Sequence, residues 1–455
     1  MSEPLTPAAL TDTRRIARIL IERGVTPSGA AEQAQLLARC ASGLIDDGAN
    51  GTCPARALFV PGRIELLGTH TDYAGGRSLI AAVQRGFATV AVGRDEARVD
   101  VLAVDLNDRA AFDLSADLTP PVGHWSNYPM TVARRLASNF STPDRPLRGA
   151  TMAMASNLPI AAGMSSSSAM VVSAALMLSA VNDLPARQAY RRNIQSPESL
   201  AEYLATIENG QTFGDLVGDK GVGTFGGSED HTAMLCCGAG ELSQYSYCPV
   251  RLERRIAWPE GYVFAVAASG VEAAKTGEAM DKYNRASHLA SAVTAAWNAA
   301  TGRADAHMAA ALASSEHAAE RMKGALADQD LRRRFDHFRI ESEQVIPAAG
   351  DALAAADLEA FGRCVDRSQE IAQTLLGNQV PETVFLARTA RQIGAVAAKA
   401  FGAGFGGSVW ALVAQDRADG FLDEWRNRYE QSFAQPAARA SFFTTRPGPA
   451  AFELA

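Results

Sequence analysis

Apolar side chains recur at helical spacing along the first part of the chain. From residue 12 to about residue 46 they fall three or four positions apart, and Gly24 and Pro27 interrupt the pattern. This spacing predicts two helices separated by a short break. From residue 56 apolar and polar positions alternate, which predicts strands. Three stretches show this alternation: ARALFVPGRIELLG, LIAAVQRGFATVAVGRD and VDVLAVD.

The middle and the end of the chain mix both patterns. GATMAMASNLPIAAG predicts a strand that ends in a turn, and SSSSAMVVSAALMLSAVNDL predicts a long helix of small residues. The stretch from 283 to 377 is rich in Ala and predicts an almost wholly helical region. IGAVAAKAFGAGFGGSVWALVA predicts a helix, then a glycine loop, then a strand.

Strand character also returns at residues 254 to 268, after a polar stretch with Pro and Gly, and we place the boundary between two lobes there. A chain of 455 residues is long enough for two lobes that share a core. The predicted fold class is therefore α+β in two lobes. The predicted divisions are a helical extension at 1–55, an N-terminal lobe at 56–255 and a C-terminal lobe at 256–455.

The composition is that of a folded globular protein, with 47% apolar and 20% charged residues. The net charge is −7 and Lys and Arg are scattered, which argues against nucleic acid or an anionic membrane surface as a partner. No apolar run approaches the ~20 residues of a membrane span, and the first residues lack the apolar segment of a signal peptide. The six Cys show no zinc-site spacing. We expect a cytoplasmic protein that binds small molecules and is monomeric or weakly homo-oligomeric.

Four consecutive hydroxyl side chains precede the long helix of small residues. They are Ser165, Ser166, Ser167 and Ser168. The free N–H groups and the positive dipole end of a helix N-terminus favour an anion, so these residues could bind phosphate oxygens or help to hold a metal. An ordinary Ser-capped helix explains the same residues equally well.

The stretch PGRIELLGTHTDYAGG gathers charged and polar side chains directly after an apolar run. They are Arg63, Glu65, His70, Asp72 and Tyr73. This set suits a polyhydroxylated small ligand, because the paired acceptors of a carboxylate bind neighbouring hydroxyls. The alternative is a polar cluster at the end of a strand, in which these side chains satisfy their own hydrogen bonds.

Two further stretches are rich in glycine. By itself, FGAGFGGSVWALV is typical of a tight turn or a backbone crossing. GTFGGSEDHTAML places Glu229, Asp230 and His231 on a glycine-rich turn, where carboxylates are usually solvated. Neither stretch alone indicates a function.

Taken in order, these segments resemble the motifs of the GHMP kinase superfamily, which includes galactokinase, homoserine kinase, mevalonate kinase and phosphomevalonate kinase. PGRIELLGTHTDYAGG resembles the galactokinase motif P-G-R-V-N-L-I-G-E-H-T-D-Y-N-x-G, and LPIAAGMSSSSA resembles the phosphate loop P-x-G-x-G-L-S-S-S-A. GGSEDHTAM resembles G-I-M-D-Q, and GAGFGGSVWALV resembles G-x-G-F-G-G. HWSNYPMTV and KYNR resemble W-x-N-Y and Y-N-x-R. The chain is identified by these motifs, from 56 to 413, as a member of the galactokinase family.

The resemblance implies a two-lobed GHMP kinase fold. The N-terminal lobe would resemble domain 2 of a small-subunit ribosomal protein, the C-terminal lobe would be ferredoxin-like, and the active site would lie in the cleft between them. The implied reaction is transfer of the γ-phosphoryl group of ATP to the anomeric C1 hydroxyl of a sugar, with Mg²⁺ present. Asp230 matches the Asp that orients or deprotonates this hydroxyl, and Arg63 matches the Arg between that carboxylate and the γ-phosphate.

The same match carries over the other roles of the family. The sugar would be bound by Thr69, His70, Asp72, Tyr73 and Tyr283. The adenine would be bound by Trp125 and Tyr128, and the phosphates by Gly163, Ser165, Ser166, Ser167 and Ser168. The Mg²⁺ ion would be held by Ser167 and Glu208. The glycines that would pack against the active-site turn from the C-terminal lobe are Gly404, Gly406 and Gly407.

Two positions of the first motif depart from the family. Thr69 stands where the family has Glu, and Glu65 stands where it has Asn. The family's Glu resembles a partner of the sugar's C6 hydroxyl, and Thr69 is shorter and neutral. Its replacement removes a repulsion against a C6 carboxylate and also a selective contact. Galactose is the predicted acceptor, and galacturonate and L-arabinose are the alternatives.

The G-I-M-D-Q segment also departs from the family, at Glu229 and His231, but it keeps the acid. A protein of another class, a regulator that binds sugar and ATP without catalysis, would not need an intact catalytic set. Because Arg63, Ser167 and Asp230 are all present, the sequence favours an enzyme.

Overall fold

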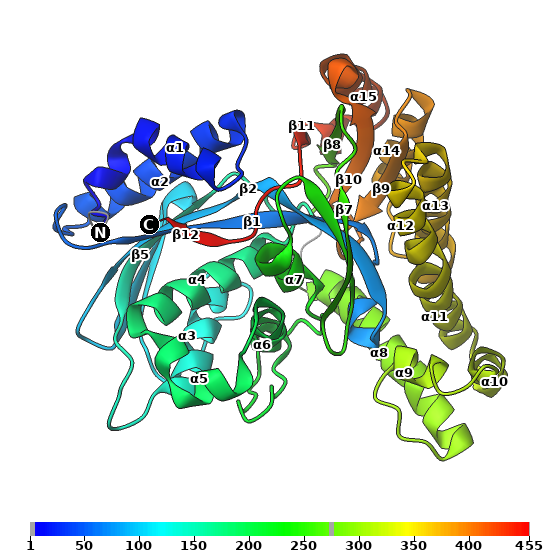
Figure 1. The fold of residues 1–455 in the computed structure, drawn as a ribbon, viewed down its shortest axis with the longest axis horizontal. Helices are drawn as coiled ribbons and strands as arrows, with labels where there is room; N and C mark the ends of the chain where they lie inside the picture. The colour runs from blue at the N-terminus through cyan, green and yellow to red at the C-terminus, as the bar shows by residue number, and fades with distance from the viewer. Residues whose placement is uncertain (1–4, 273–276, 455) are drawn as a thin grey trace.

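The computed structural model describes residues 5–272 and 277–454, which form two lobes around two β-sheets (Figure 1). The strands of the first sheet are β1 (Arg56–Leu67), β2 (Arg77–Gly93), β3 (Arg98–Ala103), β4 (Asp108–Asp113), β5 (Ala150–Ser156), β6 (Glu241–Ser246), β7 (Arg251–Ala257) and β12 (Phe452–Leu454). Their order is β12-β1-β2-β5-β3-β4, with β6 also paired to β2 and β7 paired to β6. The pairing is antiparallel except between β3 and β5.

Helices cover both faces of the first sheet (Figure 1). On one face lie α1 (Thr13–Glu22) and α2 (Pro27–Asp46). The helices near the other face are α3 (Asn127–Phe140), α4 (Ser166–Asn182), α5 (Gln188–Asn193), α6 (Pro197–Asn209) and α7 (Glu229–Cys236). Each face of the sheet packs into its own apolar core, and successive side chains of β1 alternate between the two. Phe59 packs with α2, and Val60 packs in the core that includes α4.

A side-chain cap precedes the first residue of each N-terminal helix. The Asp12 side chain accepts hydrogen bonds from the N–H groups of Arg14 and Arg15, and Thr26 accepts one from Gly29. Pro27 then occupies the first turn of α2, where its missing N–H costs nothing. The predicted pair of helices is confirmed.

The second sheet has four strands within the described residues, in the order β11-β8-β10-β9. They are β8 (Tyr262–Ala268), β9 (Ala397–Phe401), β10 (Ser408–Ala414) and β11 (Ser441–Thr445). The helices that pack on one face with a shared apolar core are α14 (Pro381–Gln392) and α15 (Ala418–Ser432). A short helix, α16 (Ala434–Ala437), follows α15.

A column of helices lies beside both sheets (Figure 1). It consists of α8 (Gly277–Thr301), α9 (Met308–Leu312), α10 (Ala318–Ala325), α11 (Gln329–Ile340), α12 (Ile346–Ala354) and α13 (Leu358–Ile371). The prediction of an almost wholly helical region from 283 to 377 is confirmed. A π-helical segment, Glu341–Val345, joins α11 to α12, and such segments often lie at functional sites.

The helix predicted directly before the last glycine loop, from Ile393, is wrong: α14 ends at Gln392, and the second half of the stretch is strand β9. Gly394, with φ 104°, follows the end of α14, and Ala397–Phe401 then pairs with β10 along its whole length. All five residues of β9 are buried. Sheet pairing and burial therefore outweigh the helix propensity of an Ala-rich run. The turn predicted at GGSEDHTAM also differs, because Glu229 begins α7.

The first sheet takes strands from both ends of the chain. β7 continues to Ala257, and β12 returns from the C-terminal region to pair with β1, so that Leu58 faces Glu453. A paired strand covers backbone groups that an open edge would expose. Strand pairing thus assigns β12 to the first sheet, within the range predicted as C-terminal lobe, and the divisions at 55 and 255 stay predictions. In the described parts of the chain, no helix is long and apolar enough to cross a membrane.

Candidate active site

Strand β1 carries Arg63 and Glu65 into the interior. The register of β1 with β2 shifts between Pro61 and Arg63, and again between Glu65 and Leu67. Irregularities of this kind re-aim side chains and are frequent beside active sites. Arg63 is 4% exposed and Glu65 3% exposed, and residues two apart in a strand point to the same side. A cation and an acid therefore enter the interior from one strand.

Arg63 contacts Asp230 in the first turn of α7. The Arg63 Nε donates to Asp230 Oδ1 at 2.7 Å, and its Nη1 donates to the carbonyl of Gly163. The same guanidinium lies 3.9 Å from Glu229 Oε1. Burial alone would lower the pKa of Arg63, but the charges of Asp230, Glu65 and Glu229 together raise it. Arg63 is thus a fixed cation at the centre of the site.

The other carboxylate oxygen of Asp230 faces the serine loop. The Ser165 hydroxyl donates to Asp230 Oδ2, and the Ser168 hydroxyl donates to it at 3.4 Å. Ser165 has φ 56°, a left-handed conformation that costs energy in any residue other than Gly and is most often kept at functional sites. Directly after it, α4 begins. The guanidinium, the acid and the serine-rich helix start, distant in sequence, therefore meet at one point.

A cavity of about 520 Å³ opens beside this cluster. Trp125, Tyr128 and several apolar side chains line one part of it, and Gly163, Ser165, Ser166, Ser167 and Arg63 line another. The Trp125 indole N–H donates to Asp108 Oδ2 at 2.7 Å. Burial and the nearby charge of Glu208 raise the pKa of Tyr128 to about 12. The predicted nucleotide residues thus line one cavity, apart from Ser168, whose side chain is turned to Asp230.

A smaller cavity, of about 40 Å³, lies on the other side of Arg63. Its lining comprises Arg63, Glu65, His70, Asp72, Tyr73, Gly227, Glu229, Asp230, Tyr283, Gly402 and Ala403. Arg63 and Ala403 line both cavities. Four of the five predicted sugar residues are in this lining, and the fifth, Thr69, is not; it is 2% exposed. Glu65 lines the cavity instead.

Asp72 is held at the cavity by backbone groups. Its Oδ2 accepts a hydrogen bond from the Glu229 N–H at 3.1 Å. A Cβ on Gly227 would lie 2.4 Å from the same oxygen, so this close approach requires glycine. Burial raises the pKa of Asp72, and the N–H groups of Glu229 and Tyr73 oppose that rise.

His70 and Tyr73 are fixed against each other and against the C-terminal lobe. His70 Nδ1 lies 2.9 Å from the Tyr73 hydroxyl, and His70 Nε2 lies 3.0 Å from the Ala403 carbonyl. The His70 and Tyr283 rings lie 5.2 Å apart between centroids. Arg334, from α11, donates to the His70 carbonyl and, at 3.2 Å, to the Tyr73 hydroxyl.

Glu229 is a buried acid of the site, 5% exposed. Burial raises its pKa well above the usual range, and the charges of Glu65 and Asp72 raise it further, while Arg63 opposes them. The Tyr283 pKa is also raised, by burial and by the charges of Asp72 and Asp230. The smaller cavity is therefore lined by several buried acids.

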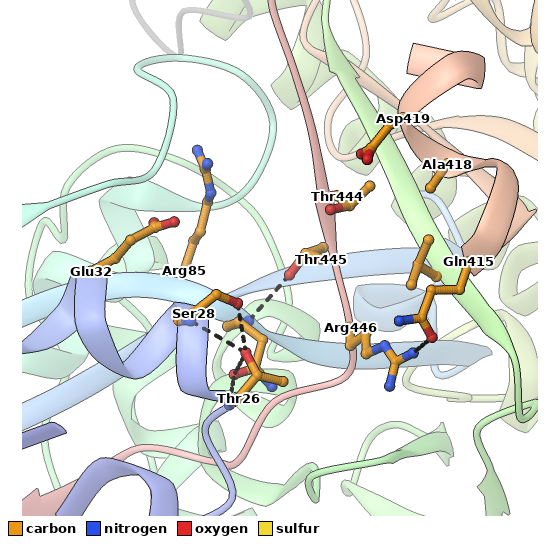
Figure 2. Close-up of a pocket in the computed structure, with 13 residues that line it drawn as sticks. Thr26, Ser28, Glu32, Arg85, Gln415, Ala418, Asp419, Thr444, Thr445 and Arg446 are labelled. Carbon is orange, nitrogen blue, oxygen red and sulfur yellow. Dashed lines mark hydrogen bonds between the residues drawn. The ribbon is translucent and has the colours of Figure 1, made fainter. Parts of the chain in front are cut away.

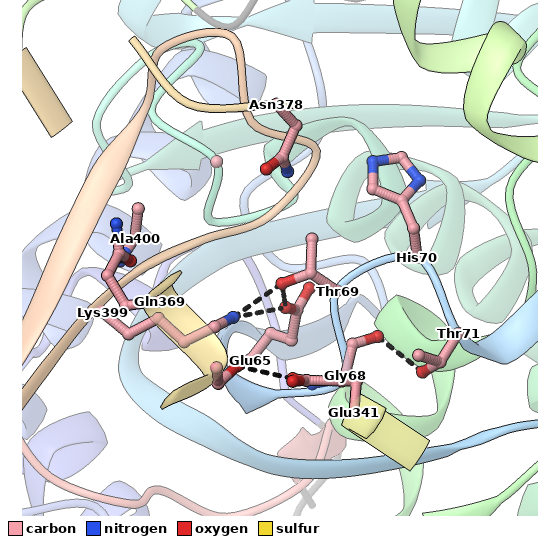
Figure 3. A network of polar contacts seen from close by, with 12 residues as sticks. Glu65, Gly68, Thr69, His70, Thr71, Glu341, Gln369, Asn378, Lys399 and Ala400 are labelled. Carbon is pink, nitrogen blue, oxygen red and sulfur yellow. Dashed lines mark hydrogen bonds and ion pairs between the residues drawn. The ribbon is translucent and has the colours of Figure 1, made fainter. Parts of the chain in front are cut away.

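Three residues that hold the loop from Gly68 to Tyr73 have no signal in the sequence motifs. Arg334 binds His70 and Tyr73, and Glu341 in the π-helical segment accepts from the Gly68 N–H at 2.9 Å (Figure 3). Lys399 on β9 donates to Thr69 Oγ1 at 2.7 Å. For Lys399 the sequence offers one clue, a charged residue within the apolar run AVAAKAF, which is expensive to bury unless it is paired. Arg334 and Glu341 lie in charged stretches that offer no such clue.

Comparisons with known proteins agree with this geometry. Three family models match the chain: "Galactokinase galactose-binding signature" at 50–94, "GHMP kinases N terminal domain" at 127–218 and "GHMP kinases C terminal" at 351–431. The galactokinase of Chloroflexus aurantiacus is 29% identical over 378 residues, 82% of this chain and 87% of that protein. The galactokinase of Exiguobacterium sibiricum is 28% identical over 415 residues, 89% of this chain and 95% of that protein.

The chain carries the galactokinase signature and both GHMP kinase domains, and it is similar to galactokinases over most of its length. It is a sugar kinase. A solved structure, Lactococcus lactis galactokinase complexed with galactose, has a TM-score of 0.73 and 24% identity, and the match covers 90% of this chain and 99% of that one. Methanococcus jannaschii mevalonate kinase has a TM-score of 0.54 and 16% identity, with 88% and 99% covered. These two similarities confirm the predicted two-lobed GHMP kinase fold.

The glycine motif of the galactokinase family has two separate contacts here. A Cβ on Gly407 would lie 3.3 Å from the Ala162 carbonyl, and one on Gly402 would lie 2.7 Å from the Gly163 carbonyl. Gly404 instead packs against Asn378, and Gly406 packs against Val271. Of the three predicted glycines, Gly407 is therefore the one that packs directly on the phosphate-loop turn.

The predicted metal residues can be tested for chemical fit. Ser167 and Glu208 are both close to Tyr128, and they offer hydroxyl and carboxylate oxygens, the hard ligands that Mg²⁺ prefers. Glu208 Oε2 accepts from the Thr224 hydroxyl at 3.3 Å, and its Oε1 lies 3.3 Å from His231 Nε2. Among residues 5–272 and 277–454, no group of three or more His, Cys, Asp or Glu could hold a metal. A Mg²⁺ ion here would take its other ligands from phosphate and water.

A third hollow, of about 410 Å³, lies away from the serine loop, between the start of α2 and the C-terminal lobe (Figure 2). Thr26, Glu32 and Arg85 line one side, and Asp419 and Arg446 line the other. Its described lining includes none of the predicted galactokinase residues. Most of the predicted site residues therefore line the two cavities that share Arg63.

Proposed function

We propose that this sugar kinase transfers the γ-phosphoryl group of ATP to the anomeric C1 hydroxyl of galactose or a closely related sugar. The observation that carries the proposal is the place of Arg63. It lines both cavities and contacts Asp230, which lines the smaller one. A donor and an acceptor bound in adjoining cavities would thus meet at one cation, where charge develops during phosphoryl transfer.

The larger cavity supports ATP as the donor. Its aromatic part, with Trp125 and Tyr128, suits a planar base. Its other part includes Ser165, Ser166 and Ser167 at the start of α4, where free N–H groups and the helix dipole favour phosphate. With its base against Trp125 and Tyr128, ATP would direct its phosphates toward the serines and Arg63, which line the same cavity.

The smaller cavity supports a sugar as the acceptor. Carboxylates, His70 and two Tyr side chains surround it, and such groups recognise hydroxyls by accepting and donating hydrogen bonds. Asp230 is the group that would accept the proton of the attacking hydroxyl. The adjacent Arg63 favours its ionised form, and the Ser165 hydroxyl fixes its orientation. The name of the Lactococcus lactis structure, a galactokinase with galactose, supports a galactose-like sugar.

Mg²⁺ is the proposed cofactor, with Ser167 and Glu208 as its protein ligands. A bound Mg²⁺ ion would neutralise charge on the transferred phosphate. Glu208 also fixes the loop after α6, because its carbonyl accepts from the Val222 N–H at 2.9 Å. Cytoplasmic location and a monomeric or weakly oligomeric state stay predictions.

A coupled ADP assay tests the proposal. Purified protein with ATP and Mg²⁺ should release ADP with at least one of galactose, L-arabinose, galacturonate and N-acetylgalactosamine. Asp230→Asn should lower kcat by about 10²-fold or more while nucleotide binding is kept. Asp351→Asn is a matched control, because Asp351 is a 75% exposed surface carboxylate. Turnover of none of the sugars, or near-normal kcat in Asp230→Asn, would show that the proposal is wrong.

A further inference from the structure

Two buried side chains hold Glu65 from behind the smaller cavity (Figure 3). Lys399 on β9 donates to Thr69 Oγ1 at 2.7 Å and lies 3.6 Å from Glu65 Oε1. The Thr69 hydroxyl in turn donates to Glu65 Oε1. Lys399 is 0% exposed and Thr69 2% exposed, so this chain of contacts is closed to water. It fixes one carboxylate oxygen and links the two lobes.

The second oxygen of Glu65 is left for a ligand. Within the described residues, no hydrogen bond reaches Glu65 Oε2, and that atom is not among the fully buried ones. Glu65 lines the smaller cavity, whereas Thr69 and Lys399 do not. A sugar in this cavity would therefore meet the Glu65 carboxylate and not the Thr69 hydroxyl, which is already bonded on both sides.

The two sequence departures from the galactokinase motif compensate each other in space. The family has Asn and Glu where this chain has Glu65 and Thr69. This chain thus keeps one acid, Glu65, four residues before the position of the family's Glu. The Thr69 hydroxyl, at that position, donates a hydrogen bond to it. The absence of Glu at the second position consequently does not remove negative charge from the cavity.

The charges around the cavity decide which sugars it can accept. Among the described residues, the lining has four acids, Glu65, Asp72, Glu229 and Asp230, and one Arg or Lys side chain, that of Arg63. Lys399 offsets the charge of Glu65 from behind but offers no donor to a ligand. A neutral sugar can donate hydroxyl hydrogens to these acids. The carboxylate of a sugar acid would lie among them, and Arg63 already binds Asp230 and the Gly163 carbonyl.

We propose that Glu65, positioned by Thr69 and Lys399, is a sugar-contacting residue that determines specificity, favouring uncharged sugars and rejecting sugar acids such as galacturonate. The inference rests on the proposed function, because it assigns the sugar to the smaller cavity. The wild-type enzyme should show a kcat/KM for galactose or L-arabinose about 100-fold or more above that for galacturonate. Comparable values for galacturonate would overturn the inference.

Two variants test the role of Glu65 itself. Glu65→Gln keeps the size of the side chain and removes its charge, so the preference for the neutral sugar should fall about 10-fold or more, mainly through a higher KM for that sugar. Because this variant leaves Lys399 without a counter-charge, Glu65→Gln combined with Lys399→Met restores the balance and should show the same loss of preference. An unchanged preference in both variants would contradict the inference.

Glu341→Gln is the matched control. Glu341 is also a buried acid that holds the same loop, through the Gly68 N–H, but it does not line the cavity. Its loss can change KM for every sugar, but the ratio between neutral and acidic sugars should stay within about threefold of wild type. A change in that ratio as large as in Glu65→Gln would mean that loop geometry, and not the Glu65 charge, sets the preference.

Sugar binding separates the failure of this inference from the failure of the proposed function. If no sugar is phosphorylated, the proposed function is wrong, and calorimetric titration of galactose and of galacturonate still measures the preference. Tighter binding of galactose that is lost in Glu65→Gln would support the inference. Equal binding of both sugars would overturn it.

Discussion

Asp230 is held by donors from two other segments of the chain. Arg63 comes from β1, Ser165 precedes α4, and Asp230 itself lies in the first turn of α7. The cation binds one carboxylate oxygen and the hydroxyls bind the other, so neither oxygen can rotate away. A group fixed in this way is ready to receive a proton without reorganisation, which is the main requirement of an efficient general base.

The geometry of Arg63 leads to a prediction about a conservative substitution. Arg63→Lys keeps the charge but cannot contact both Asp230 and the Gly163 carbonyl. We expect kcat to fall by about 10²-fold, with a smaller change in the affinity for ATP. Steady-state kinetics measure both. Arg56→Lys, at a 44% exposed position of the same strand, is the control, and a kcat within about threefold of wild type in Arg63→Lys would contradict the assigned role.

The raised pKa of Glu229 leads to a prediction about pH. A folded-state pKa above the ordinary glutamate value of ~4.3 means that the wild type loses stability as pH rises from that value through the raised pKa. Glu229→Gln has no proton to lose there. We therefore expect the variant to be more stable than wild type at pH 7 to 8, by on the order of 1 kcal/mol, with the difference vanishing near pH 4.

Thermal unfolding at several pH values measures this difference. The gain in Tm should grow with pH between about 4 and 8. A wild type that is more stable than Glu229→Gln at pH 8, or a difference independent of pH, would contradict the assigned environment of Glu229.

Residues inside the motifs could be predicted from the sequence, and their partners could not. Arg63, Asp230 and Asp72 were found because each stands in a recognisable motif. Lys399 is 330 residues from Thr69, and Arg334 is 264 residues from His70. Only folding brings such pairs together, and no local pattern indicates which buried cation meets which loop.

At the scale of elements, the turn before α7 sets the shape of the smaller cavity. Gly227 lies against both Asp72 and the Tyr73 backbone N, and a Cβ there would be 2.4 and 2.8 Å from them. We expect Gly227→Ala to raise KM for the sugar about 10-fold or more with little change in KM for ATP. Gly324→Ala in α10 is the control, because a Cβ at Gly324 would meet nothing within 4 Å. Equal changes in both KM values would contradict the assignment of the two cavities.

The elements were predictable where the local pattern agrees with the global fold. α2 has a cap, a Pro in its first turn and helical spacing, and all three indicate the same element. β9 has a run of Ala that favours a helix, but its pairing with β10 and its burial decide otherwise. Because those contacts are made with residues far along the chain, the local sequence could not show them.

At the scale of the whole molecule, α1 and α2 stabilise the first sheet from the face opposite α4 (Figure 1). Leu37 of α2 is fully buried in that core. Leu37→Ala should cost about 2–5 kcal/mol of stability, and KM of the folded enzyme should be unchanged. Ile21→Ala, at a 45% exposed position, should cost less than about 0.5 kcal/mol. Denaturant unfolding and kinetics check both, and a changed sugar KM in Leu37→Ala would place these helices in the function of the site.

The two-lobed architecture could also be predicted, because strand patterns precede and follow a long helical region. The pairing of the last strand, β12, with β1 could not be predicted from the sequence. Phe452–Leu454 is too short to show a periodic pattern, and it is a strand because β1 offers it an edge.

The central claim is that donor and acceptor meet at Arg63 and Asp230, so that phosphate is transferred to the anomeric carbon. Phosphorus NMR of the product formed from ATP, Mg²⁺ and an accepted sugar tests it directly. Wild type should give a single sugar phosphate with the phosphorus coupled to the anomeric proton, and Asp230→Asn should give almost none. Phosphate on another carbon, or ADP formation without a sugar phosphate, would contradict the account.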